Sequence, residues 1–182
     1  MSTELDSGTE AAPIAWGPPT SRTVTWFDPH ATAEAARAVP GIDFLEAIRT
    51  GVLPPAPIAA TLGFTVLELE IGRVVFECTP DESLYNPIGV VHGGLVCTLA
   101  DTVVGCAVHT TLDAGFTYTS IDLTVSYLRP VTGSSGTLRA TGTVTKSGRR
   151  VAFASAEIVD GSGRAVATAT GSCLVMEIPS PG

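Results

Sequence analysis

The sequence predicts an α+β fold in which one antiparallel β-sheet wraps around one long helix. Two short segments of alternating apolar and polar residues come first, at Phe64–Ile71 and Arg73–Thr79. A long and almost entirely apolar segment follows within Asn86–Thr111, and four further alternating segments come after it. Alternation indicates strands with one buried face, whereas a long apolar segment with helical spacing indicates a helix. Two strands, a helix and four strands in this order favour an α+β arrangement.

The chain before the first strand predicts an N-terminal arm and short helices. Residues 1 to about 24 are rich in Ser, Thr, Gly, Pro and Glu, which is typical of a mobile or loosely packed arm. Short helices are expected at Ala31–Val39, Asp43–Thr50 and Ile58–Leu62. The chain is therefore divided into an arm with a short helix over residues 1–43, one domain over residues 44–177 and a tail over residues 178–182.

The later strands are expected at Phe116–Arg129, Gly136–Lys146, Arg150–Val159 and Arg164–Glu177. In the first of them, alternation places Ser120 on a polar face, opposite the face that carries Leu123. The last strand has small residues on one face, namely Ala165, Ala167, Ala169, Gly171 and Cys173. Small residues would let a bulky helix lie close to the sheet. Because sheet edges need a cover, we expect dimerisation through an edge strand.

The central stretch combines a turn, a His-Gly-Gly sequence and one carboxylate. The turn is Asn86-Pro87-Ile88-Gly89, and His92, Gly93 and Gly94 follow it. A helix that is apolar nearly all round is buried in soluble proteins, and this one is too short and too interrupted to span a membrane. Asp101 is its only carboxylate. Because a buried Asp is paired, protonated or in use, Asp101 is the leading candidate for a functional residue.

This stretch resembles the hotdog-fold thioesterases, in particular the family typified by the phenylacetate-pathway (PaaI-like) acyl-CoA thioesterases. The resemblance lies in Asn86-Pro87-x-Gly89-x-x-His92-Gly93-Gly94, in Asp101 nine residues after His92, and in the strand from Ser120 to Pro130. It implies a hotdog fold and hydrolysis of an acyl- or aryl-CoA to the free acid and coenzyme A. It implies no cofactor, since coenzyme A is part of the substrate. It also suggests a homo-oligomer, either a dimer or a homotetramer built as a dimer of dimers.

Thioester hydrolysis needs a polarised carbonyl and a nucleophile beside it. A helix N-terminus presents unpaired amides and the positive end of its dipole, so the Gly93 N–H is the predicted oxyanion donor, and Gly94 leaves the substrate free access. Asp101 could attack the carbonyl or activate a water molecule, and the sequence leaves both routes open. Asn86 and His92 would organise the loop or orient the substrate. Ser120 matches the position where the family carries a Ser or Thr that holds the water.

Gly93 and Asp101 are too far apart to act together within one protomer. Eight residues of helix at about 1.5 Å each separate them by roughly 12 Å. Two antiparallel helices around a two-fold axis would bring Gly93 of one protomer close to the partner's Asp101. We therefore predict a site shared between protomers, which the resemblance also implies.

Plainer interpretations of the same residues stay open. Asp101 could be a structural acid, Gly93 and Gly94 could serve close packing alone, and His92 could be a hydrogen-bonded core histidine. Cys97, Asp101 and His109 share one helix face, but His109 is too far along the helix to share an ion with Asp101 and Cys97. No metal site is expected.

Cationic and apolar residues predict how a substrate would be held. Two groups of cations could bind the phosphates of coenzyme A. One is Arg129, and the other is formed by Lys146, Arg149 and Arg150 around the predicted Ser147-Gly148 hairpin. Solvation alone would also explain the cations of the hairpin. An apolar pocket for the acyl group is suggested by Val104, Val108, Phe116 and Tyr118.

Composition restricts the setting in which the protein acts. With 182 residues and a net charge of −8, the chain predicts one domain that does not bind nucleic acid, although a small anionic ligand stays possible. The N-terminus lacks the pattern of a signal peptide, and the four cysteines form no C-x-x-C pair. We therefore expect a cytoplasmic protein with buried free thiols and no membrane partner.

Two other functions fit the same fold. A hotdog hydratase or dehydratase would act on enoyl or hydroxyacyl thioesters and would release no thiol. A non-catalytic acyl-CoA binder would saturate with ligand and leave it intact. Asp101 has no second acid near it in the motif, which favours hydrolysis over hydration.

Overall fold

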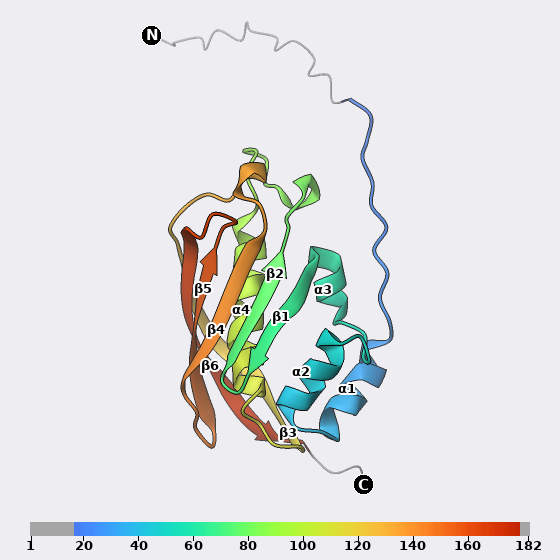
Figure 1. Cartoon of the computed structure of the whole chain (residues 1–182), viewed down its shortest axis with the longest axis vertical. Helices are drawn as coiled ribbons and strands as arrows, with labels where there is room; N and C mark the ends of the chain where they lie inside the picture. Colours follow the sequence, from blue (N-terminus) through green and yellow to red (C-terminus); the bar gives the residue numbers. More distant parts are fainter. Residues whose placement is uncertain (1–16, 179–182) are drawn as a thin grey trace, which may run out of the picture.

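The computed structural model of the chain describes residues 17–178, which form one antiparallel sheet around one long helix (Figure 1). The helices are α1 (Pro29–Arg37), α2 (Gly41–Arg49), α3 (Pro57–Leu62) and α4 (Gly93–His109), with 3-10 turns at Glu82–Leu84 and Gly133–Ser135. The strands are β1 (Phe64–Glu70), β2 (Arg73–Cys78), β3 (Phe116–Tyr127), β4 (Leu138–Lys146), β5 (Val151–Val159) and β6 (Ala165–Glu177). The six strands are ordered β1-β2-β4-β5-β6-β3, and every neighbouring pair is antiparallel. The predicted α+β layout is confirmed.

The core lies between α4 and the inner face of the sheet. Leu99, Val103 and Ala107 of α4 are fully buried there. The sheet meets the helix with small residues, and a Cβ atom on Gly142 would lie 2.1 Å from the Val103 carbonyl oxygen. Ala167 and Ala169 of β6 are buried on the same face, as their alternation predicted. The small residues therefore set the short distance between helix and sheet.

Several strands do not keep the strict alternation that the sequence predicted, and β3 and β1 are the two that bear on the site. The pairing of β3 with β6 shifts between Ser120 and Asp122, which leaves Ile121 as the extra residue of a β-bulge. A second bulge in β1 leaves Leu67 unpaired opposite β2. Each bulge moves the residues that follow it to the other face of the sheet. Ser120 therefore lies on the α4 side of β3 together with Leu123, and the predicted placement of Ser120 on the opposite face is wrong.

The helices α1, α2 and α3 lie together at one side of the sheet, next to β1 (Figure 1). Gly41 at the start of α2 packs directly on the end of α4, because a Cβ atom there would lie 2.0 Å from the His109 carbonyl oxygen. The Gly41 N–H also donates to the Leu112 carbonyl oxygen at 3.0 Å. The expected boundary between the N-terminal arm and the domain, at residues 43 and 44, falls inside α2, which begins at Gly41. The division of the chain into arm, domain and tail stays a prediction. Residues 1–16 of the expected arm and residues 179–182 of the tail lie outside the described residues.

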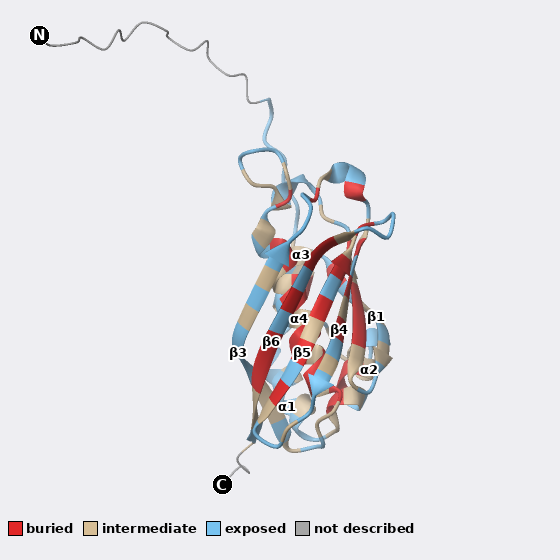
Figure 2. Cartoon of the chain, turned by 90° about the vertical axis from the view of Figure 1, so that its left-hand side faces the viewer, coloured by how far each residue is buried: buried red, intermediate tan, exposed pale blue. Residues whose placement is uncertain are grey.

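Strand β3 forms one edge of the sheet and is open to solvent along most of its length (Figure 2). Ile121 and Tyr127 are 55% and 56% exposed, respectively. Strand β5 shows the alternation of buried and exposed residues that is expected of one solvent-facing side, whereas β6 contains runs of consecutive buried residues (Figure 2). A long exposed edge strand with apolar side chains is a surface that proteins usually cover.

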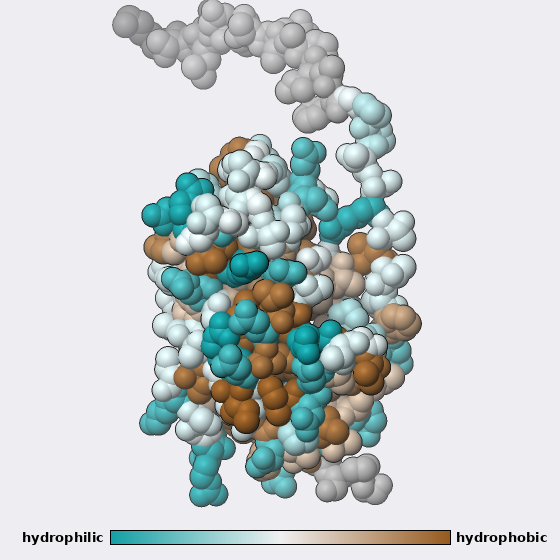
Figure 3. Space-filling model, in the orientation of Figure 1, coloured by the Kyte–Doolittle hydropathy of each residue, from teal (hydrophilic) through white to brown (hydrophobic). Residues whose placement is uncertain are grey.

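Apolar residues also gather in the middle of the face shown in Figure 3, over β1, β2 and β4, with polar residues around them. The four cysteines are free thiols, as expected, but only Cys78 and Cys173 are fully buried. None of the described helices is long and apolar enough to cross a membrane.

Candidate active site

The N-terminus of α4 is capped by the side chain of His92. Its Nδ1 accepts a hydrogen bond from the Gly94 N–H at 2.8 Å, and its backbone is extended. In a neutral imidazole the proton then resides on Nε2. A Cβ atom on Gly94 would lie 2.7 Å from this Nδ1, so the cap itself requires glycine at position 94. His92 therefore organises the turn.

The Gly93 amide is free. Its N–H has no acceptor among the described residues, as expected for the first residue of a helix. Tyr127 of β3 packs against it, since a Cβ atom on Gly93 would lie 3.3 Å from the Tyr127 ring, and the Tyr127 hydroxyl donates to the Gly93 carbonyl oxygen at 3.1 Å. Tyr127 was not selected from the sequence, although its place on the strand that also carries Ser120 was an available clue.

Asn86 holds the loop that precedes α4. Its Oδ1 accepts a hydrogen bond from the Ile88 N–H at 3.1 Å, and its own N–H donates to the Val90 carbonyl oxygen at 2.8 Å. The side-chain oxygen is thus used inside the loop. The side-chain amide nitrogen has no acceptor within residues 17–178, so it can still donate to a ligand.

Asp101 lies on a part of α4 that the sheet does not cover. The prediction that the helix is buried all round is wrong, because Gly94 and Asp101 are exposed and Thr98 is half-buried. We call these three residues the open stripe of α4. The Ser120 hydroxyl donates to Asp101 Oδ1 at 2.8 Å. The bulge at Ile121 makes this contact possible, because it puts Ser120 on the helix side of the strand.

The open stripe of α4 and the exposed edge strand β3 adjoin each other. The hydrogen bond from Ser120 to Asp101 and the one from Tyr127 to Gly93 both join the strand to the helix. Within one protomer, Gly93 and Asp101 remain separated by about 12 Å of helix. Both groups therefore face the same uncovered side, at positions too distant to contact one carbonyl group.

The predicted cationic residues fall at two distant places. Arg129 lines a hollow of about 240 Å³ together with Gly93 and Tyr127, and it donates to the Ala165 carbonyl oxygen. The hairpin that carries Lys146, Arg149 and Arg150 lies near the other end of α4, since Gly72 hydrogen-bonds both Val144 and the helix cap Thr110. Only Arg129 lies beside the Gly93 end of the helix in the same protomer.

A larger, mostly apolar cavity of about 400 Å³ begins at Asp101 and lies between α4, β1 and α2. Of the residues predicted to form an apolar pocket, Tyr118 lines this cavity. Val104 and Val108 instead face the sheet as fully buried core residues, and Phe116 does not line it. Sequence reasoning missed the contribution of α2, although the apolar spacing of Phe44 and Ile48 already indicated an inward face.

Burial makes the nearby thiols poor nucleophiles. It raises the pKa of Cys106, which lines the cavity, to about 12, and it also raises the pKa of Cys173. A cysteine attacks as its thiolate, which such a pKa disfavours at neutral pH. No group of three His, Cys, Asp or Glu side chains that could hold a metal ion occurs in the described part of the chain. Asp101 is therefore the most accessible candidate nucleophile or base on α4.

Known proteins resemble this chain in sequence and in fold. Residues 88–167 match the family model of the thioesterase superfamily. Human acyl-coenzyme A thioesterase 13 is 30% identical over 53% of this chain and 67% of its own length. A protein of Saccharolobus solfataricus, whose name assigns it provisionally to the esterases, is 31% identical over 63% of this chain and 80% of its own length.

The fold also has solved relatives. The Escherichia coli PaaI protein of the phenylacetic acid degradation operon shares 25% identity, with a TM-score of 0.65 over 74% of this chain and 96% of that protein. Hundreds of other solved chains also match, which agrees with the hotdog arrangement of one sheet around one helix. The resemblance found in the Asn86–Asp101 stretch is confirmed. The chain belongs to the thioesterase superfamily and is a thioester hydrolase.

Proposed function

We propose that this protein is an acyl-CoA thioesterase that hydrolyses an acyl- or aryl-CoA to the free acid and coenzyme A, with no added cofactor. The proposal is supported by the relationship to human acyl-coenzyme A thioesterase 13 and by the pairing of an exposed Asp101 with Ser120. That hydrogen bond is the single observation that carries it, because it orients the one carboxylate of the open stripe without burying it.

The reaction breaks the carbonyl carbon–sulfur bond and forms a carbonyl carbon–oxygen bond. In one route, Asp101 takes a proton from water as the water oxygen attacks. In the other route, Asp101 attacks first and water hydrolyses the resulting anhydride. In both routes the sulfur leaves as the thiolate or thiol of coenzyme A. The Gly93 N–H stabilises the oxyanion, Asn86 and His92 hold the loop, and Ser120 orients Asp101 or the water.

The site is shared between two protomers in this proposal. The exposed edge strand β3 and the open stripe of α4 adjoin each other, so a second copy that covers one also covers the other. A two-fold axis there would set Gly93 of one protomer against the partner's Asp101. The assembly is a cytoplasmic dimer or a homotetramer built as a dimer of dimers, and Arg129 with the hairpin cations binds the phosphates of coenzyme A.

The first experiment measures thiol release from acetyl-, hexanoyl-, decanoyl- and phenylacetyl-CoA by the wild type and by Asp101→Asn. We expect the variant to lose at least about a hundredfold in rate, near 3 kcal/mol of barrier. Asp122→Asn is the matched control, because Asp122 lies on the same strand region as Ser120 but bonds Ser172 on the other side of the sheet. Absence of thiol release from every ester would exclude the proposal and would return a hydratase or a binder to consideration.

A second experiment tests the sharing of the site. Asp101→Asn and Gly93→Pro protomers, each inactive alone, are unfolded together and refolded as a mixture. Random pairing in a two-fold dimer gives half heterodimers, each with one intact site of two, so activity should return to about a quarter of the wild-type value. If mass spectrometry detects heterodimers but the mixture recovers no activity, each protomer carries its own complete site.

A further inference from the structure

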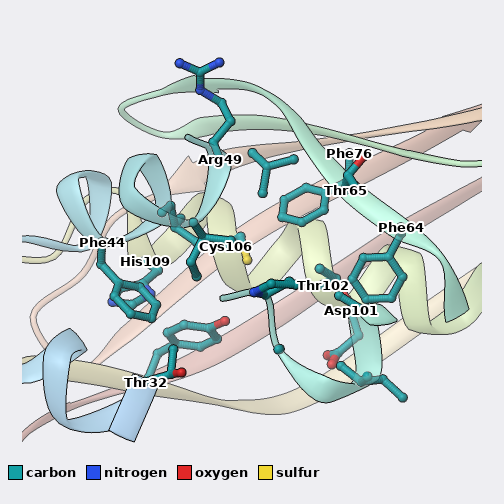
Figure 4. A pocket seen from close by; sticks show the side chains of 18 residues that line it. Thr32, Phe44, Arg49, Phe64, Thr65, Phe76, Asp101, Thr102, Cys106 and His109 are labelled. Atoms are coloured by element: carbon teal, nitrogen blue, oxygen red, sulfur yellow. The ribbon is translucent and has the colours of Figure 1, made fainter. Parts of the chain in front are cut away.

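The cavity next to Asp101 runs along the second half of α4, toward His109 (Figure 4). Its walls come from α1, α2, α3, β1, β2, β3 and α4. Most of its lining is apolar or aromatic and includes Phe44, Ile48, Phe64, Phe76 and Tyr118. Its volume of about 400 Å³ is within the range of small-molecule sites. An apolar cavity that begins at a candidate catalytic carboxylate is suited to the part of a substrate attached to the reacting carbonyl.

Aromatic side chains close the end of the cavity that is remote from Asp101. The ring centroids of Phe44 and His109 are 5.6 Å apart, and those of His109 and Tyr118 are 5.5 Å apart. Gly105 makes room for Tyr118, since a Cβ atom there would lie 2.5 Å from its ring. Figure 4 shows Phe44 beside His109 at one end of the hollow, with Asp101 and Phe64 toward the other.

Between its two ends the cavity carries no free charge. Arg49 lines it but is held by Glu46 through two hydrogen bonds, of 2.6 and 2.7 Å. Burial lowers the pKa of His109 and raises that of Cys106 to about 12, so both are neutral at neutral pH. Such walls favour an uncharged apolar ligand, because a buried charge would find no partner.

The length of the cavity follows from the helix that forms its wall. Asp101 and His109 are eight residues apart on α4, which corresponds to about 12 Å. A carbon–carbon bond of about 1.5 Å with a chain angle near 111° advances an extended chain by about 1.25 Å per carbon. About eight to ten carbons therefore reach from a carbonyl at Asp101 to the Phe44–His109 pair.

We propose that this cavity binds the straight acyl chain of a medium-chain acyl-CoA, of about eight to ten carbons, and that α2 sets the accepted length through Phe44 and Ile48. The inference rests on the proposed function, whose substrate class it specifies. Phe44 and Ile48 lie four residues apart and both line the cavity, so they share one face of α2. Helix α2 also lies outside residues 88–167, the part that matches the family model. In this proposal, chain length is selected by a segment that the family model does not include.

The test is the dependence of kcat/KM on chain length, from acetyl- to hexadecanoyl-CoA, with phenylacetyl-CoA as the aryl comparison. The wild type should prefer octanoyl- or decanoyl-CoA. Ile48→Trp fills the cavity and should lower kcat/KM for decanoyl-CoA at least about tenfold, while acetyl-CoA stays within about threefold. The matched control is Val52→Trp just after α2, where the side chain is 77% exposed, and it should keep the wild-type profile.

The converse variant is Phe44→Ala, which removes the closed end. It should raise the ratio of dodecanoyl- to octanoyl-CoA hydrolysis about tenfold. Its control is Ile42→Ala, on the same helix but not in the cavity wall. Should Phe44→Ala fail to fold, Ile48→Trp still decides the question, because Ile48 is only half-buried.

Binding separates this inference from the proposed function. Isothermal titration calorimetry of Asp101→Asn with the same acyl-CoA series should show an affinity that increases with chain length up to decanoyl-CoA. The double variant Asp101→Asn/Ile48→Trp should lack this increase. A wild type that releases no thiol would refute the function, and this titration would still test the cavity. Three results would overturn the cavity inference and leave the function intact. They are a kcat/KM that is independent of chain length, a kcat/KM that is highest for phenylacetyl-CoA, and a chain-length profile that is unchanged in Ile48→Trp.

Discussion

Replacing Gly93 by proline tests the predicted oxyanion donor with little other change. Gly93 is the first residue of α4, where a proline is accepted because the helix does not use that N–H. The preceding residue, His92, has φ −64° and ψ 132°, an extended conformation that suits a residue before proline. The substitution therefore removes one hydrogen-bond donor and should leave the helix folded.

The expected magnitude is that of a single oxyanion donor. Loss of one such donor typically lowers kcat by a factor of about 10² to 10³, or about 2.7 to 4 kcal/mol. Gly93→Ala is the matched control, because it keeps the N–H and adds the same Cβ atom at 3.3 Å from the Tyr127 ring. The ratio of the two variants therefore reports the replacement of the N–H by the proline ring, separate from any displacement of Tyr127 by the shared Cβ atom.

The assay is thiol release at saturating acyl-CoA, with circular dichroism melting to verify that both variants are folded. We expect Gly93→Ala to stay within about tenfold of the wild type and Gly93→Pro to fall at least about a hundredfold below Gly93→Ala. Equal kcat values for the two folded variants would refute the reasoning, since the N–H would then contribute nothing to the transition state.

Three further predictions concern Ser120, His109 and Leu99. Ser120→Ala removes the hydrogen-bond donor to Asp101 and should lower kcat about tenfold or more, since hydrogen bonds to charged groups contribute about 1.5–3 kcal/mol. Ser120→Thr keeps a hydroxyl group and should retain activity. A fully active Ser120→Ala would contradict this prediction. Because burial lowers the pKa of His109, the unfolded state binds the proton more readily, so the urea midpoint should fall as pH drops below about 6.5, and His109→Gln should lack that part of the fall. An identical pH dependence in both proteins would exclude His109 as the cause. Leu99→Ala should lower the free energy of unfolding in urea by about 2.7–5 kcal/mol, because Leu99 is fully buried. The exposed-site control Val52→Ala should change it by under about 0.5 kcal/mol. Equal losses of stability in the two variants would contradict the assigned core.

Local patterns were enough to predict the order and type of the elements. Glycine and proline mark most of the ends, and apolar periodicity identifies each strand and the long helix within one to three residues, as with Phe116–Arg129 against the observed Phe116–Tyr127. The loop from Asn86 to Gly94 was also predictable, because its Asx turn and histidine cap are contacts between residues two to four positions apart.

Side-chain direction was less predictable wherever a strand carries a bulge. The extra residue Ile121 is defined by the register of β3 against β6, and that register depends on residues about 50 positions away in the chain. Alternation counted along the sequence therefore gave the wrong face for Ser120. The exposure of Asp101 was missed for a related reason, since apolar composition does not reveal which side of a helix the sheet leaves uncovered.

The sequence by itself determined the α+β class, the free amide at the start of α4, and the place of Asp101 as the one carboxylate of that helix. These features depend on neighbouring residues and on helix geometry, which short-range sequence records. Only the tertiary structure decided that Ser120 reaches Asp101, that Tyr127 holds Gly93, and that α2 walls the apolar cavity. These contacts join segments distant along the chain, and they form because the sheet must cover the apolar sides of α4 while its edge and one stripe of the helix stay open.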